Sequence, residues 1–156
     1  MSVSCSTYED MLRYKQILTS ADRITYYESL PNSEVLELCK KAHIGLLPTM
    51  ADTYGYSVLE MQSCGCAVIS TDIRALPEMN NEECGYIVSV PKAPSTEAVY
   101  GTPQQLSQLK QSIADGLYSA FSEILNNPEA VKAKANAAVE KNQKRPFSRA
   151  LRSETC

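Results

Sequence analysis

The sequence is poor in several residue types, and each shortage excludes a class of protein. It has no tryptophan and one histidine, and it has no apolar run near the roughly 20 residues that a membrane-spanning helix needs. Basic residues are not in excess, because 15 lysines and arginines face 18 aspartates and glutamates. The net charge of −3 therefore favours neither a nucleic-acid partner nor an anionic membrane surface. The polar start, Ser2 to Asp10, is not typical of a signal peptide.

The residues that are present suit a folded protein. The chain has 156 residues, of which 44% are hydrophobic and 21% are charged, a composition typical of a soluble globular domain. That length allows one domain with a substantial core. We predict a single domain over residues 1–156, ending in a polar tail, 144–156, that is frayed.

The six cysteines could indicate disulfides, a metal site or buried thiols. Their spacing matches no zinc signature, and the lone His43 is far from any group of four ligands. We interpret them as reduced, mostly buried thiols of a cytoplasmic protein, and we expect no metal. Metal or redox chemistry at Cys64 and Cys66 is the alternative.

Local patterns predict the first elements of the chain. Ser6 to Glu9 reads S-x-x-E, a capping box that opens a helix through about Thr19. The segment Arg23–Leu30 is short and rich in tyrosine and isoleucine, which predicts a strand. Pro31-Asn32-Ser33 begins an amphipathic helix whose apolar positions recur at i, i+3, i+4 and i+7.

The next segment alternates between strand and helix. Ile44–Leu47 is a short apolar run closed by a proline, which is typical of a strand covered on both faces. A helical stripe begins at Tyr54 and stops at Gly65, and Cys66 to Ile69 gives a second buried strand. A strand, a helix and a strand in so few residues form a βαβ unit with a parallel sheet.

The remaining elements complete the predicted fold. We expect a short helix at Leu76, a last strand from Tyr86 to Val90 near the sheet edge, and long helices beginning at Thr102-Pro103 and Asn127-Pro128. The fold class is therefore α/β, a partial Rossmann-like three-layer domain. Its parallel sheet is short, with about four strands, helices cover both faces, and two helices end the chain.

Ligands of such folds bind at the carboxyl ends of the strands, where helix N-termini point. The residues that follow the first buried strand there are Asp52, Thr53, Tyr54, Gly55, Tyr56 and Ser57, and Glu60 lies further along the helix. Gly55 lets a ligand approach the backbone closely. The first-turn N–H groups suit a phosphate, and Glu60 can accept two hydrogen bonds from a ribose.

This segment carries a family resemblance. The residues Asp52-Thr-Tyr-Gly-Tyr-Ser-Val-Leu-Glu60 resemble the E-x7-E signature of retaining GT-B glycosyltransferases, glycosyltransferase family 4. The following Gln62-Ser-Cys-Gly-Cys-Ala-Val-Ile and Arg74-Ala-Leu-Pro-Glu78 resemble that family's A-x-G-x-P-V-I segment and its donor loop. The resemblance covers about residues 24–90 and extends more weakly to Ala138.

The resemblance implies roles for particular residues. Asp52 would contact the transferred sugar, and Glu60 would hold the ribose of the nucleotide. The backbone of Tyr54, Gly55, Tyr56 and Ser57 would donate to the sugar and the diphosphate, and Arg74 is the best-placed cation for that diphosphate. The sequence departs from the family at Asp52, which is one methylene shorter than glutamate, and at Ala67, where the family usually has proline.

The implied activity is transfer of a hexosyl group from a UDP- or GDP-sugar to a saccharide or lipid-linked acceptor, in polysaccharide biosynthesis. The donor is a substrate, and no cofactor or metal is expected, since no D-x-D-like acid pair occurs in a suitable loop. The family's acceptor domain and Gly-rich first βαβ portion have no counterpart before Arg23. We therefore expect the C-terminal part of a donor domain, inactive alone, from a parent protein that is cytoplasmic or peripheral at the membrane.

Other readings of these residues stay open. Asp52 could cap the helix, Arg74 could be a solvated loop residue, and both tyrosines could serve packing. The chain could be a non-catalytic remnant or interaction module that kept the fold without turnover. It could also be a generic nucleotide-binding domain in which the spacing of Asp52 and Glu60 is a coincidence.

Overall fold

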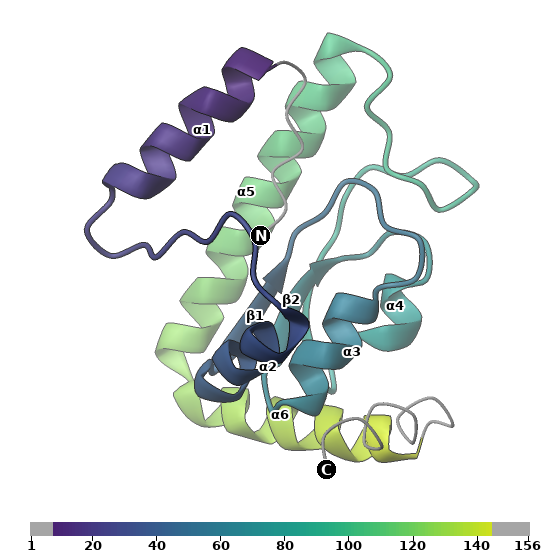
Figure 1. Ribbon diagram of the computed structural model, residues 1–156. Helices are drawn as coiled ribbons and strands as arrows, with labels where there is room; N and C mark the ends of the chain where they lie inside the picture. The colour runs from purple at the N-terminus through teal and green to yellow at the C-terminus, as the bar shows by residue number, and fades with distance from the viewer. Residues whose placement is uncertain (1–7, 145–156) are drawn as a thin grey trace. The chain divides into compact units, whose positions relative to one another are not determined.

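The computed structural model describes residues 8–144 (Figure 1). The elements, in chain order, are α1 (Tyr8–Ser20), α2 (Asn32–Lys41), β1 (Ile44–Leu47), α3 (Tyr56–Ser63), β2 (Ala67–Thr71), α4 (Leu76–Met79), β3 (Gly85–Val88), α5 (Pro103–Asn126) and α6 (Pro128–Gln143). The chain divides into two compact units, the first ending at Val35 and the second beginning at Leu36.

The first unit contains α1 and the segment that follows it. α1 ends at Ser20, close to the predicted end at Thr19, while the predicted capping box falls on Ser6, which lies outside the described residues. An ion pair of 2.9 Å joins Lys15 Nζ to Glu28 Oε1 and so links the helix to this following segment. Both side chains are substantially exposed, so the pair contributes little to stability.

The strand predicted at Arg23–Leu30 is wrong. Within the described residues this segment has no strand, and the sheet has three strands instead of about four. Three of its apolar side chains, Ile24, Tyr26 and Tyr27, are 37–49% exposed. High β-propensity makes a strand only where a neighbouring strand supplies hydrogen-bond partners and burial, and this segment has neither.

The sheet itself matches the predicted fold class, α/β with parallel strands. The strand order is β1-β2-β3, and both pairs are parallel. The central strand β2 is buried at all five positions, because helices cover both of its faces. The last strand, β3, lies at the sheet edge as predicted.

Helices pack on the sheet in layers (Figure 1). α3 contacts β1 and β2, α5 contacts β2 and β3, and α6 contacts β2, β3 and α3. α5 approaches its strand closely at Gly116, where a Cβ would lie 2.5 Å from Val88 Cγ1. The largest fully buried apolar side chains are Ile69, Ile73, Leu76, Leu109, Val58, Val68 and Val88. This confirms the Rossmann-like arrangement with two long helices at the end of the chain.

The predicted helix ends are also largely as expected. α3 ends at Ser63 with Cys64 as its C-cap, followed by Gly65 with a φ of 91°, the left-handed stop expected from the sequence. Its start is later than predicted, at Tyr56, because Gly55 is the N-cap. α5 begins with a capping box between Thr102 and Gln105.

Buried amides connect the helices to the sheet. Asn80 Nδ2 donates to Val68 O and Ser70 Oγ of β2, both at 2.9 Å, and to Tyr86 O of β3 at 3.3 Å. Gln62 of α3 donates to Asn80 Oδ1, and Asn142 of α6 donates to Gln62 Oε1 at 3.2 Å. Through Asn80, these bonds link α3 and α6 to β2 and β3.

Among the described helices, none combines the length and the apolar character that crossing a bilayer requires. The predicted tail, 144–156, lies outside the described residues except for Lys144. The single-domain assignment of residues 1–156 stays a prediction.

Candidate functional site

The loop between β1 and α3 carries most of the predicted site, and it is held by short hydrogen bonds. Asp52 Oδ1 accepts the N–H groups of Tyr54 at 3.0 Å and of Gly55 at 2.6 Å. Thr71 Oγ1, at the end of β2, donates to Thr49 O at 2.7 Å and ties the loop to the neighbouring strand. The structure thus places Asp52 as the acceptor of a turn immediately before α3, but the N-cap of the helix is Gly55, without a side-chain cap, so Asp52 holds the turn and does not cap the helix. Its sugar contact stays a prediction.

Gly55 is needed for two reasons at this turn. Its φ is 82°, in the left-handed region that other residues adopt at a cost. A Cβ on it would also lie 2.6 Å from Leu76 Cδ2 of α4. The backbone therefore passes close to α4 at the point where the sequence predicted close approach by a ligand.

Two tyrosines flank the glycine. The rings of Tyr54 and Tyr56 are in contact, with centroids 4.8 Å apart and planes tilted by 34°, and the two residues are 44% and 52% exposed. An exposed aromatic pair can offer a flat surface to a base or a sugar. Ser57 is the second residue of α3 and is exposed as well. Their backbone role toward a ligand stays a prediction.

Glu60 lies on the same helix, half-buried between Leu59 and Met61. It follows Gly55 by five residues, about 7.5 Å along the helix axis at 1.5 Å per residue. Burial raises the pKa of the Cys39 thiol, and the charge of Glu60 raises it further. The Glu60 carboxylate is therefore near enough to Cys39 of α2 for its charge to act on the thiol, whereas Asp52 engages its own turn.

The Cys66 thiol contacts backbone carbonyl groups and so has a structural role. Cys66 Sγ donates to Cys39 O at 3.2 Å and to Ala42 O at 3.5 Å, which joins β2 to the end of α2. Burial raises the pKa of Cys66 to about 11. Its thiolate is therefore scarce at neutral pH. Burial also raises the pKa of the Cys64 thiol. The four cysteines of the described region, Cys39, Cys64, Cys66 and Cys84, are free, while Cys5 and Cys156 lie outside it.

Arg74 lies in the loop after β2 and already has a partner. Its guanidinium forms an ion pair with Glu97, and the backbone N–H of Arg74 donates to Thr96 O at 3.0 Å. Arg74 and Glu97 line a pocket of about 90 Å³ together with Met50, Ala51, Ile73, Ala98 and Tyr100. The pocket joins the loops after β1 and β2, but neither Asp52 nor Glu60 lines it. Arg74 as a diphosphate ligand stays a prediction.

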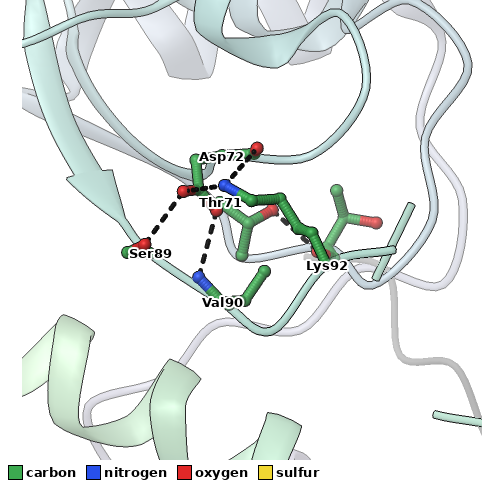
Figure 2. Close-up of polar contacts among 6 residues, drawn as sticks. Thr71, Asp72, Ser89, Val90 and Lys92 are labelled. Atoms are coloured by element: carbon green, nitrogen blue, oxygen red, sulfur yellow. Dashed lines mark hydrogen bonds and ion pairs between the residues drawn. The ribbon is translucent and has the colours of Figure 1, made fainter. Parts of the chain in front are cut away.

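A second polar cluster at this end of the sheet was missed by the sequence reasoning (Figure 2). Asp72 accepts the N–H of Val90 at 3.0 Å and the hydroxyl of Ser89 at 3.0 Å, and it forms an ion pair with Lys92. The cluster closes the loops after β2 and β3 against each other. A single aspartate in a loop gives no pattern, so only its position at a strand end could have drawn attention to it.

The described residues contain no group of three or more histidine, cysteine, aspartate or glutamate side chains placed to hold a metal ion. The donor groups of the site are instead backbone N–H groups, hydroxyls and the Arg74 guanidinium. Such groups can bind phosphate oxygens and sugar hydroxyls directly.

Comparisons with known proteins find one matching family and one related glycosyltransferase subunit. The family described as glycosyl transferases group 1 matches residues 6–101, which include the loop before α3, Glu60 and Arg74. The phosphatidylinositol N-acetylglucosaminyltransferase gpi3 subunit of Schizosaccharomyces pombe is 31% identical over 70 residues, or 45% of this chain. The match spans 15% of the length of that relative. The chain belongs to the glycosyl transferases group 1 family.

Proposed function

We propose that the chain forms part of the donor-binding region of a retaining glycosyltransferase. The parent protein would transfer a hexosyl group from a UDP- or GDP-sugar to a saccharide or lipid-linked acceptor. The observation that carries this proposal is the family match over residues 6–101, because it contains the whole segment from Asp52 to Glu60. That segment lies at the carboxyl end of β1, where ligands of parallel sheets bind.

The proposed roles follow the geometry of the loop and helix. Glu60 accepts hydrogen bonds from the ribose, and the first turn of α3 directs its positive dipole end toward the diphosphate. Arg74 supplies the positive charge beside the diphosphate. Asp52 contacts the sugar through its carboxylate, which also accepts the Gly55 N–H in the turn before α3. Stabilisation of the departing diphosphate by these groups would be the main contribution of this region to catalysis.

The acceptor is proposed from the relative. Because the S. pombe protein is named as a subunit of a phosphatidylinositol N-acetylglucosaminyltransferase, we favour a lipid-linked acceptor and an N-acetylhexosamine donor over a free saccharide. The parent protein would then work at a membrane surface. An acceptor in polysaccharide biosynthesis is the other possibility that the family allows.

Binding of donor nucleotides tests the role of Glu60. We expect the 156-residue chain to bind UDP- or GDP-sugars in calorimetric titration, and Glu60→Gln to bind them about 10- to 100-fold more weakly. Loss of a charge-assisted hydrogen bond costs about 1.5–3 kcal/mol, which corresponds to that range. Glu140→Gln, an exposed substitution on α6 with the same change in charge, is the control. Equal affinities in all three proteins would remove Glu60 from the site.

The role of Asp52 is tested by comparing a nucleotide-sugar with the bare nucleotide. Asp52→Asn keeps an acceptor oxygen for the N–H groups of Tyr54 and Gly55 but removes the charge. We expect the wild type to prefer the nucleotide-sugar and the variant to lose that preference. If the variant keeps the preference for the nucleotide-sugar, Asp52 has only the structural role of holding the turn before α3. Absence of nucleotide binding in the wild type would favour the non-catalytic interaction module.

A further inference from the structure

Two non-glycine residues of the described chain have positive φ, and they meet in one contact. Arg74 has a φ of 46° and Thr96 a φ of 66°. The Arg74 N–H donates to Thr96 O at 3.0 Å. Non-glycine residues adopt this region at a cost, so they persist only where the surrounding structure holds them. The surrounding structure therefore holds the contact between the loop after β2 and the turn at residues 93–97 in place.

The turn at residues 93–97 is built by its own hydrogen bonds. Ala93 N–H donates to Glu97 O at 2.8 Å, and Thr96 N–H donates to Ala93 O at 2.9 Å. An isolated antiparallel bridge between Lys92 and Ala98 closes its base. The turn thus carries Glu97 to a fixed place beside Arg74.

The carboxylate of Glu97 forms an ion pair with the Arg74 guanidinium, and both residues line the pocket of about 90 Å³. Both side chains are accessible, at 41% and 50% exposure, and the other side-chain contact of Glu97 is a 3.5 Å approach by Ser95 Oγ. Asp72 differs, because it is only 13% exposed and also accepts from the Val90 N–H and the Ser89 hydroxyl. Glu97 can therefore leave its cation more easily than Asp72 can.

We infer that Glu97 is a specificity-determining residue that competes with ligand phosphate for Arg74. The inference rests on the proposed function, since it takes Arg74 as the diphosphate ligand. A guanidinium binds carboxylates and phosphates through the same N–H donors, so Glu97 and a ligand phosphate compete for Arg74. The pocket, at about 90 Å³, is smaller than the roughly 300 Å³ or more of a typical ligand site, so it can take only a small part of a ligand beside Arg74.

The competition has a direction set by charge. A diphosphate brings about two negative charges and several acceptor oxygens, whereas Glu97 brings one charge. An exposed ion pair is weak enough to exchange with such a ligand. A nucleoside without phosphate cannot displace Glu97, so Arg74 stays neutralised and adds nothing to its binding. Glu97 therefore lowers the affinity of the site for ligands that carry phosphate groups and leaves its affinity for a bare nucleoside unchanged.

Substitution of Glu97 tests this inference by calorimetric titration at low ionic strength. The probes are inorganic pyrophosphate, UDP and uridine. We expect Glu97→Gln to bind pyrophosphate and UDP about two- to fivefold more tightly than the wild type, the range that corresponds to an exposed ion pair. Uridine affinity should not change. In the double variant Glu97→Gln/Arg74→Gln the gain should disappear.

Several outcomes would overturn the inference. It fails if Glu97→Gln leaves pyrophosphate binding unchanged or weaker, if neither protein binds pyrophosphate, or if the gain survives without Arg74. It also fails if Glu140→Gln gives the same gain, because the effect would then come from net charge. A gain for pyrophosphate without any binding of nucleotides would support the competition and contradict the proposed function, so the two failures can be told apart.

Discussion

Gly85, at the start of β3, shows how closely the interior is packed around a buried amide. A Cβ at this position would lie 2.0 Å from Asn80 Oδ1 and 2.5 Å from Val68 O. Asn80 is fully buried and connects β2 with β3 through its side-chain amide. Neither the backbone oxygen nor the bonded amide can move without losing hydrogen bonds.

We expect Gly85→Ala to lower the free energy of unfolding by about 3 kcal/mol or more, because the new methyl group overpacks the site and breaks a buried network. Urea denaturation followed by circular dichroism measures the change. Gly101→Ala is the matched control, since its Cβ would meet only Gln105 Oε1 at an ordinary 3.5 Å. Similar stabilities for the two variants would show that Asn80 adapts.

At the scale of an element, α5 depends on its first turn. Thr102 Oγ1 accepts the Gln105 N–H at 3.2 Å, and Gln105 Oε1 accepts the Thr102 N–H at 3.1 Å. The helix is 24 residues long and covers β3, so its start determines how much of the sheet it protects. The start of this helix at Thr102-Pro103 was predicted from the sequence, because a cap is a local interaction, while the return bond from Gln105 was not predicted.

Thr102→Ala should therefore destabilise the chain by about 0.5–2 kcal/mol, whereas Thr102→Ser should retain most of the cap. Thermal unfolding of the two variants beside the wild type measures the difference. Equal melting temperatures for alanine and serine would indicate that tertiary packing alone fixes the start of α5.

At the scale of the whole molecule, residues 21–31 stand out because they have no helix or strand and are mostly exposed. They precede the boundary between the two compact units at Val35 and Leu36. Proteases need an extended, unprotected stretch of backbone, and regular elements must open before they are cut. Arg23 lies in an exposed turn that a single hydrogen bond closes, from the Ile24 N–H to Ala21 O at 3.0 Å, so it opens more easily than Lys40, which lies within α2.

Brief trypsin treatment should release a fragment that begins at Ile24 before any cut occurs at Lys40. Mass spectrometry of the digest identifies this fragment, and Arg23→Gln should remove it. An intact bond after Arg23 when Lys40 is already cleaved would mean that the segment is protected in solution.

Much of the architecture follows from the order of residues alone. The apolar run Ile44–Leu47, the stop at Gly65 and the caps at Thr102 and Asn127 act between residues a few positions apart, so their patterns specify the elements directly. The candidate loop from Asp52 to Glu60 was recognisable for the same reason, since its residues are contiguous.

Contacts between distant parts of the chain were settled by the folded structure. The pairing of Arg74 with Glu97 and of Asp72 with Lys92 joins loops that only the sheet topology brings together. The segment Arg23–Leu30 has the composition of a strand, yet it forms none in the described structure, because strand formation requires a neighbour that composition cannot supply. Local chemistry thus specified the helix ends at Gly65 and Thr102, the strand Ile44–Leu47 and the loop before α3, and long-range packing decided which segments form strands and which charges meet at the site.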